Sequence, residues 1–279
     1  SWALDRMAPR HDGYTVFWVQ VMTGTLFGLG VGPGDPELIT LKAHRILQAA
    51  PVLAYPAPET GDSLARRIVA PHLNGNRIEV AIRMPLSAPQ FPDESVYGKA
   101  AKSLGTHLSA GKDVAVLCEG DPFFYGSFMY LFARVAEQHT VEVVPGVSSP
   151  MACAAALGAP LAAQNDILTV LPAPLETELL KERLATCDAA AIIKLGRHFS
   201  RIRSMLSDMK LMEHSRYIER ATMENERILQ LDAVNPDASP YFSMILVHRR
   251  GKAWQRWAGP PLSSSRKRQI GRRNQYAPP

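Results

Sequence analysis

Apolar and polar residues follow two different rhythms along the chain. From Thr25 to about Val144, short apolar runs alternate with stretches that carry apolar residues at helical spacing. Strands are predicted near 25–30, 51–55, 78–84, 113–118 and 141–144, and helices near 36–50, 62–72, 94–110 and 126–138. Because strands and helices alternate along the chain, the pattern of this half predicts a parallel or largely parallel sheet covered on both faces.

The rhythm changes after residue 144. Pro145–Pro150 opens a helix of small residues, 151–157, for which Ser148 or Ser149 is a suitable N-cap and Gly158 the end. Further strands are predicted at 167–171, 189–195, 215–221, 226–231 and 241–247. Since the last three follow one another without helical stretches, we expect a mixed sheet with antiparallel pairs. The chain thus predicts two α/β domains, an N-terminal one over 22–143 and a C-terminal one over 144–248.

The two ends of the chain differ from this body. Residues 1–21 have no clear period and are expected to form an upstream segment, with Met22 as a natural start. Residues 249–279 contain nine Lys or Arg and no acid, and residues 1–21 sum to zero, so the net charge of +5 leaves −4 for residues 22–248. We expect 249–279 to be a disordered, solvated tail. The alternative is that it contacts nucleic acid or an anionic membrane, and neither is a predicted partner.

Composition narrows the class of protein. A chain of 279 residues that is 46% apolar can bury a large core, and it has no run of 18 apolar residues that would cross a membrane. The apolar run at 17–22 is too short for a secretory signal. Three cysteines without a C-x-x-C pair predict free, mostly buried thiols in a reducing cytoplasm. The eight histidines lack metal-ligand spacing, so no metal site is expected.

Two similar turns carry the candidate chemistry. Gly32-Pro33-Gly34-Asp35-Pro36 and Glu119-Gly120-Asp121-Pro122 each follow a predicted strand and lead toward a helix. Ligands of α/β sheets bind at the carboxyl ends of strands, so the two turns suggest two walls of one site. Gly34 and Gly120 would permit a positive φ and a close approach by a ligand. The alternative is that each is an ordinary turn, with Asp35 as an N-cap.

These loops exclude two common nucleotide sites. The glycines at 28–34 do not fit G-x-G-x-x-G, and no Gly-Lys-Ser/Thr of a P-loop is present. Asp35 and Asp121 place negative charge where a phosphate would lie, which favours a cationic or hydrogen-bond-donating ligand. No nucleophile–base set is visible, and Glu219 and Glu224 are expected to face solvent. Such a shortage favours group transfer from a reactive cofactor, and a sulfonium methyl donor with Asp121 at its cationic end fits.

Three segments resemble the motifs of the tetrapyrrole (corrin/porphyrin) methylases in order and spacing. They are Leu29–Ala43 (first motif), Glu119–Ser127 (second motif) and Val144–Ser149 (third motif). Within that family, the chain is similar to the precorrin-2 C20-methyltransferases in Val52–Pro58 followed by Ser63–Arg66, in the longer segment leading to Ile82–Pro85, and in Cys118–Tyr125. The resemblance implies a two-domain α/β homodimer with S-adenosylmethionine in the cleft between domains. It also implies an acidic tetrapyrrole substrate of the vitamin B12 pathway and precorrin-3A as product.

The resemblance also implies roles for individual residues. The cofactor contacts carried over from the motifs are Pro33, Glu119, Gly120, Asp121, Tyr125, Ser148, Ser149, Leu195, Ala221 and Thr222. Gly34 and Asp35 would face the tetrapyrrole, and its carboxylates would meet Arg66, Arg67, Arg83 or Lys194. Asp35 is the catalytic candidate, because it could hydrogen-bond pyrrole N–H groups or accept the proton lost at the methylated carbon.

Three alternatives stay open. The substrate could contain cobalt, or the methyl group could go to another tetrapyrrole position. A protein of a different class could use the same cleft to bind a nucleotide or tetrapyrrole without turnover. The family is expected to end soon after Val247, so the basic tail is given no catalytic role.

Overall fold

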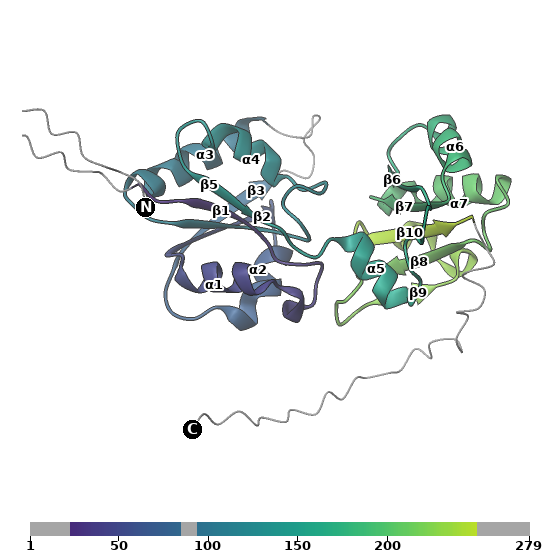
Figure 1. Ribbon diagram of the computed structural model, residues 1–279, viewed down its shortest axis with the longest axis horizontal. Coiled ribbons are helices and arrows are strands. Elements are labelled where there is room, and N and C mark those ends of the chain that lie inside the picture. The colour runs from purple at the N-terminus through teal and green to yellow at the C-terminus, as the bar shows by residue number, and fades with distance from the viewer. Residues whose placement is uncertain (1–22, 85–93, 250–279) are drawn as a thin grey trace, which may run out of the picture.

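The computed structural model describes residues 23–84 and 94–249, which form two five-stranded sheets (Figure 1). The first sheet has the strand order β3-β2-β4-β1-β5, and each neighbouring pair is parallel. Its strands are β1 (Leu26–Gly30), β2 (Val52–Pro58), β3 (Ile78–Met84), β4 (Val114–Cys118) and β5 (Val141–Val144). The prediction of a parallel sheet in this half is confirmed.

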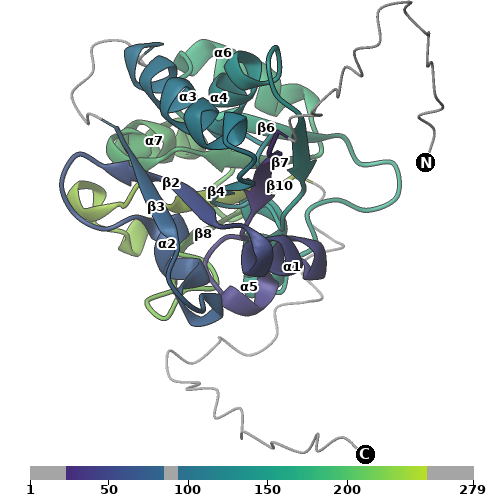
Figure 2. The same cartoon turned by 90° about the vertical axis from the view of Figure 1, so that its left-hand side faces the viewer.

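Helices cover both faces of the first sheet. Helices α1 (Leu41–Ala49) and α2 (Leu64–Val69) lie on one face, and α3 (Glu94–Ser109) and α4 (Phe128–Val135) lie on the other (Figures 1 and 2). Each face has its own apolar core, one around Leu47 and Leu117 and the other around Leu104 and Phe128. All five residues of β4 are buried. A central strand that is covered on both faces is expected to be a continuous apolar run, and the sequence of β4 is such a run.

The second sheet is mixed, as predicted. Its order is β6-β7-β10-β8-β9, in which β6 and β7 pair in parallel while the other three pairs are antiparallel. The strands are β6 (Leu168–Pro172), β7 (Ala189–Ile193), β8 (Ser215–Glu219), β9 (Arg227–Leu229) and β10 (Ser243–His248). Helix α5 (Ser149–Leu157) packs on one face, and α6 (Thr177–Thr186) and α7 (Phe199–Asp208) pack on the other. Helices α6 and α7 lie outside the predicted elements.

The prediction of one helix over 36–50 is wrong. Pro36–Leu38 forms a single 3₁₀ turn, and Ile39 and Thr40 then adopt extended backbone angles. The hydroxyl of Thr40 accepts a hydrogen bond from the Ala43 amide at 3.2 Å and so begins α1 afresh. Asp35 does act as a cap, but of the 3₁₀ turn: its Oδ1 accepts a bond from the Glu37 amide at 2.9 Å. A second capping residue therefore divides an apolar pattern that looked continuous.

The structure also bears on the predictions about the cysteines and the helices. Cys118, Cys153 and Cys187 are free and buried, as expected. None of the described helices is long and apolar enough to cross a membrane. The segment 1–21 and the tail after Arg249 lie outside the described residues. The first sheet ends at Val144 and the second begins at Leu168, while the domain bounds stay a prediction.

Candidate functional site

The two Gly-Asp-Pro turns meet at the carboxyl ends of the neighbouring strands β1 and β4. Gly120 donates a backbone hydrogen bond to the Gly32 carbonyl at 2.8 Å, and Gly32 donates one to the Gly120 carbonyl at 3.3 Å. From here β1 leads to α1 on one face of the sheet, and β4 leads to α4 on the other. Connections that diverge between adjacent parallel strands open a crevice, which is where such sheets bind ligands. The turns therefore lie at the expected place for a site.

Glycines pack the three motifs against one another. A Cβ atom on Gly146 would lie 2.2 Å from the Gly120 carbonyl oxygen, and one on Gly30 would lie 2.5 Å from the Gly146 nitrogen. Gly120 has a φ of +68°, which L side chains rarely adopt. The backbones of the first, second and third motifs thus touch directly, and a side chain at these positions would separate them.

Asp121 ties the second motif to the third. Its Oδ1 accepts a hydrogen bond from the Phe123 amide at 2.9 Å, and its Oδ2 accepts one from the Gly146 amide at 3.0 Å. Both carboxylate oxygens are therefore engaged with backbone donors of the loops that follow β4 and β5 of the first sheet. This is a structural tether, and contact between Asp121 and the cationic end of a ligand stays a prediction.

Glu119 is the acidic group held beside this junction. Its Oε1 accepts a hydrogen bond from the Ala65 amide, in the first turn of α2, at 3.3 Å. Burial raises the pKa of the Glu119 carboxyl above its usual range. The thiol of Cys118 also has a raised pKa, because it is buried and because Glu119 and Asp121 lie nearby. The end of β4 therefore carries concentrated negative charge in a poorly solvated place.

Ser148 and Ser149 begin helix α5. Ser148 occupies the N-cap position and Pro150 lies in the first turn, as predicted, and Gly158 ends the helix with a φ of +61°. The Ser148 side chain makes no capping hydrogen bond, and its Oγ donates to the Met151 sulfur at 2.9 Å. Ser149 is exposed. The N-terminus of this nine-residue helix follows directly from the third motif, beside the two turns.

Four of the six described residues other than glycine that have a positive φ lie around the site. Positive φ angles occur at Tyr125 (+55°), Lys194 (+59°), Arg220 (+50°) and Thr222 (+69°). Such conformations are costly in residues other than glycine and tend to occur at functional sites. The Lys194 ammonium lies over the Tyr125 ring, 5.4 Å from its centroid. This contact joins the end of β7 to the loop that follows β4.

The first turn contacts the second half of the chain. The Asp35 amide donates a hydrogen bond to the Thr222 hydroxyl at 3.1 Å. A Cβ atom on Gly34 would lie 2.6 Å from the Met223 Cγ and 3.2 Å from the Ala221 carbonyl oxygen. Gly34 would permit a positive φ but does not adopt one, and that conformation belongs to Gly32, with a φ of +82°. Gly34 is needed for a close approach by the protein itself.

The remaining predicted cofactor residues differ in accessibility. Pro33 is buried, and Leu195 is fully buried in the core beneath α7. Ala221 is 8% exposed and Thr222 is half-buried. Tyr125 presents an accessible ring, 44% exposed. Leu195 and Ala221 could thus meet a ligand chiefly through their backbone.

Two of the arginines proposed for substrate carboxylates, Arg66 and Arg83, already have partners. Arg66 makes an ion pair with Glu79 at 2.9 Å, and this bond lowers the pKa of the Glu79 carboxyl. Arg83 donates to the Pro58 carbonyl at 3.0 Å while its side chain remains accessible. Arg67 is exposed. Arg66 is therefore a weak candidate for binding a ligand, and Arg83 is a better one.

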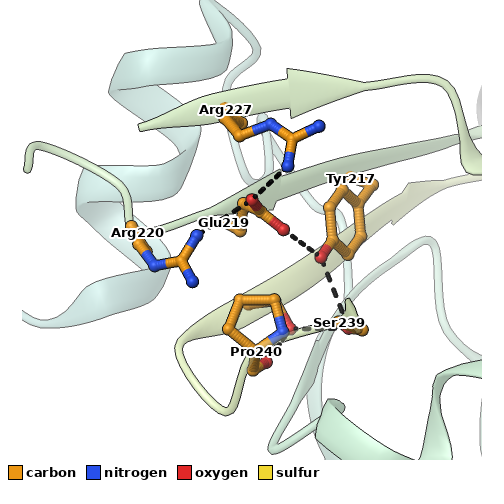
Figure 3. Close-up of polar contacts among 7 residues, drawn as sticks. Tyr217, Glu219, Arg220, Arg227, Ser239 and Pro240 are labelled. Carbon is orange, nitrogen blue, oxygen red and sulfur yellow. Dashed lines mark hydrogen bonds and ion pairs between the residues drawn. The ribbon is translucent and has the colours of Figure 1, made fainter. Parts of the chain in front are cut away.

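The expectation that Glu219 faces solvent is wrong. Its side chain is 3% exposed and lies among Tyr217, Arg220 and Arg227 (Figure 3). Glu224 is exposed, as expected. No residue pattern near Glu219 in the sequence signals this burial.

Two residues near the site were not identified from the sequence. Glu226 accepts a hydrogen bond from the Thr222 amide at 2.7 Å and so closes the turn that contacts Asp35. Tyr241 is 62% exposed and stacks edge-on against Phe242. Desolvation of the Tyr241 hydroxyl raises the pKa of Tyr241, and the nearby charge of Glu119 raises it further. Two accessible aromatic residues directly before a buried strand were the available signal.

The described side chains around the site offer groups that can bind a ligand. Among residues 23–84 and 94–249, no group of three or more His, Cys, Asp or Glu side chains could hold a metal ion. The site instead combines an acidic side chain, backbone groups at strand ends and an accessible aromatic ring.

Curated relatives match most of this chain. It is 40% identical over 232 residues to the cobalamin biosynthesis protein CobIJ of Mycobacterium bovis, which covers 80% of this chain and 46% of that protein. The chain thus spans about half the length of CobIJ. It is 39% identical to the precorrin-2 C(20)-methyltransferase of a Sinorhizobium species, covering 81% of this chain and 96% of that enzyme. It is 35% identical to the cobalt-precorrin-2 C(20)-methyltransferase of Salmonella typhimurium, covering 82% of this chain and 98% of that enzyme.

A solved structure and a family profile agree with these relatives. The uroporphyrin-III C-methyl transferase of Thermus thermophilus, complexed with S-adenyl homocysteine, aligns with a TM-score of 0.61 at 22% identity, over 82% of this chain and 94% of that one. This likeness supports the fold. The profile of the Tetrapyrrole (Corrin/Porphyrin) Methylases matches residues 25–234. The chain belongs to the tetrapyrrole methylase family.

Proposed function

We propose that the chain is an S-adenosylmethionine-dependent methyltransferase that methylates precorrin-2 at C20 to give precorrin-3A in cobalamin biosynthesis. The observation that carries this proposal is the 39% identity over 96% of a precorrin-2 C(20)-methyltransferase. The cobalt-specific relative is matched over 98% of its length at 35% identity, so both kinds of relative support the same methylated position.

The residues at the site fit S-adenosylmethionine. That molecule has two cationic groups, a carboxylate and a flat adenine, so it needs acidic, donating and apolar partners. Glu119 supplies negative charge, the amides at the start of α5 supply donors, and Tyr125 supplies an accessible ring. The tight packing of Gly30, Gly120 and Gly146 leaves backbone groups, rather than side chains, at the strand ends.

In this proposal the two walls of the crevice have different tasks. S-adenosylmethionine, when bound, supplies an activated methyl group, so the chain contributes position and electrostatics. The second motif, with the start of α5 and the turns at Leu195 and Ala221-Thr222, forms the cofactor wall. Gly34 and Asp35 form the substrate wall. Asp35 accepts hydrogen bonds from pyrrole N–H groups or takes the proton lost at the methylated carbon.

Carboxylates of the tetrapyrrole would be met by accessible cationic side chains. Arg83 and Arg67 are the candidates on the first half, since Arg66 is paired with Glu79. Lys194 lies over Tyr125 and is half-buried. We further propose that the protein is cytoplasmic and acts as a homodimer. Light scattering of the purified protein would test the dimer.

The decisive experiment offers the protein both substrates. Precorrin-2 and cobalt-precorrin-2 are incubated separately with S-adenosylmethionine labelled in its methyl group, and the label is located in the product by NMR. Label at C20 supports the proposal, and the preferred substrate identifies the route. Label at another carbon would reassign the position. If neither tetrapyrrole is labelled although S-adenosylhomocysteine binds tightly, the chain is a binding protein instead.

Asp35→Asn tests the proposed catalytic group. The amide keeps an oxygen that can accept the Glu37 hydrogen bond, so the turn should persist while a proton acceptor is lost. We expect turnover to fall about a hundredfold, the lower end for general acid–base catalysis, with the affinity for S-adenosylhomocysteine unchanged. Unchanged turnover would leave Asp35 as a cap.

A further inference from the structure

A buried carboxylate lies at the end of β8, directly before the turn that carries Ala221 and Thr222. Glu219, the last residue of β8, is 3% exposed, and three side chains surround it (Figure 3). Its Oε2 accepts a hydrogen bond from the Tyr217 hydroxyl at 2.8 Å, and its Oε1 accepts bonds from Arg220 at 3.0 Å and Arg227 at 3.3 Å. A buried carboxylate is costly unless it is paired, and here it is fully paired.

One set of these bonds holds the turn that contacts the substrate wall. Arg220 directly follows Glu219, and its φ of +50° begins a turn in which Thr222 has a φ of +69°. The Thr222 hydroxyl accepts the bond from the Asp35 amide, and the Thr222 amide donates to Glu226. Two strained residues persist only when the surroundings determine them strongly. The ion pair between Glu219 and Arg220 supplies one such constraint.

The other set holds the loop that carries Tyr241. The Tyr217 hydroxyl lies 3.3 Å from the Ser239 Oγ, which in turn lies 3.3 Å from the Ser243 Oγ. Ser243 donates to the Pro240 carbonyl at 2.6 Å. The Arg220 amide also donates to the Phe242 carbonyl at 2.8 Å, so the two loops are bonded to each other. Glu219 is thus the group shared by both.

We propose that Glu219 is a positioning residue that locks the 220–226 turn and the 239–242 loop together, so that Thr222 meets Asp35. The inference rests on the proposed function, because that function places the Ala221-Thr222 turn in the cofactor wall. Replacing a buried ion pair by apolar residues is often neutral for stability. A charged group with partners on two loops is therefore better explained by the geometry that it enforces.

Hydrogen exchange of the purified protein, without cofactor, tests the positioning role. Glu219→Gln keeps the side-chain volume and can still accept a bond from Tyr217, but it loses the charge that holds both arginines. We expect exchange in residues 220–223 and at the Asp35 amide to become about tenfold faster, because these amides open locally. Glu224→Gln, on the same turn but exposed, is the matched control and should exchange like the wild type.

A second variant guards against misfolding. Arg227 is 60% exposed, so Arg227→Met should fold while removing one of the two cationic partners. We expect an intermediate increase in exchange in residues 220–223. If Glu219→Gln and Arg227→Met both leave exchange there within about twofold of the wild type, the positioning role is overturned.

Calorimetry with S-adenosylhomocysteine then connects the loops to the site. For Glu219→Gln we expect the Kd for S-adenosylhomocysteine to rise about tenfold. In turnover assays the KM for S-adenosylmethionine should rise about tenfold with a smaller change in kcat, because a misplaced wall weakens binding first. A purely structural role would lower the melting temperature and leave the Kd of the folded protein unchanged. If the wild type does not bind S-adenosylhomocysteine, the proposed function fails, while the exchange result still decides whether Glu219 positions the loops.

Discussion

The two Gly-Asp-Pro turns have the same local chemistry and different tasks. In each, the Asp Oδ1 accepts a hydrogen bond from the amide two residues later at 2.9 Å, from Glu37 in the first turn and from Phe123 in the second. Beyond that bond they diverge. Asp121 bonds the Gly146 amide, which follows β5 of the same sheet, whereas the Asp35 amide bonds Thr222, which follows β8 of the other sheet and is 187 residues away.

This difference separates a structural junction from a contact between halves. The second turn fixes the second motif to the third, where the chain leaves strands β4 and β5 of the first sheet. The first turn is where the second half docks, and Gly34 makes room for that docking. Substitutions at the second turn should therefore reduce the stability of the fold, and substitutions at the first should chiefly affect binding and turnover.

Gly146→Ala should have the largest effect. The added Cβ would lie 2.2 Å from the Gly120 carbonyl oxygen, and backbone cannot move aside as a flexible side chain can. We expect the free energy of unfolding in urea to fall by about 3 kcal/mol or more. Gly98→Ala in α3, where an added Cβ meets nothing within 4 Å, is the control and should raise stability by about 0.5 to 1 kcal/mol. Equal effects at the two glycines would contradict the junction.

Asp121→Ala and Asp35→Ala compare the turns directly. The first leaves the Phe123 and Gly146 amides without their acceptor, and we expect a loss of about 2 kcal/mol in the free energy of unfolding. The second removes the cap of a single 3₁₀ turn, which costs about 1 kcal/mol or less. Urea denaturation of both variants measures the difference. A larger loss for Asp35→Ala would reverse the assignment of the junction.

Glu119→Gln should change how stability depends on pH. Burial raises the folded-state pKa above the ordinary value of 4.5, so between the two values the folded state binds more protons than the unfolded state. The free energy of unfolding of the wild type should thus fall as pH rises from about 4.5 through the folded pKa, and the variant lacks this decline. Melting temperatures from pH 4 to pH 8 should show the variant gaining on the wild type. A constant difference over that range would mean that burial leaves this pKa unchanged.

Gly34→Ala should affect stability least and function more. The added Cβ would approach the Met223 Cγ to 2.6 Å, and a methionine side chain can move aside. We expect unfolding to change by less than about 1 kcal/mol while kcat/KM falls about tenfold, because the Thr222 contact shifts. Met223→Ala in the same chain should restore part of the activity. If turnover survives Gly34→Ala intact, the docking contact is not needed for the reaction.

The sequence predicted the elements of the first half well and several contacts poorly. Strand β4 and the N-cap position of α5 have local signals, an apolar run and a Ser-Ser-Pro start, and both were found. The break before α1 was missed because Thr40 lies within an apolar pattern that continues on both sides. Glu219 was placed in solvent because no local pattern shows that Tyr217 and Arg227 would enclose it.

Some features of this protein are therefore set by residues that are neighbours in the sequence, and others by tertiary packing. The sequence by itself determined the alternation of strands and helices, the capped turns and the resemblance to the tetrapyrrole methylases, because these depend on residues that are close along the chain. The tertiary structure decided that Gly34 faces Met223, that Asp121 bonds Gly146 and that Glu219 is buried. Those contacts join residues far apart in the sequence or depend on what encloses a side chain, and only the packing of the sheets and loops brings them together.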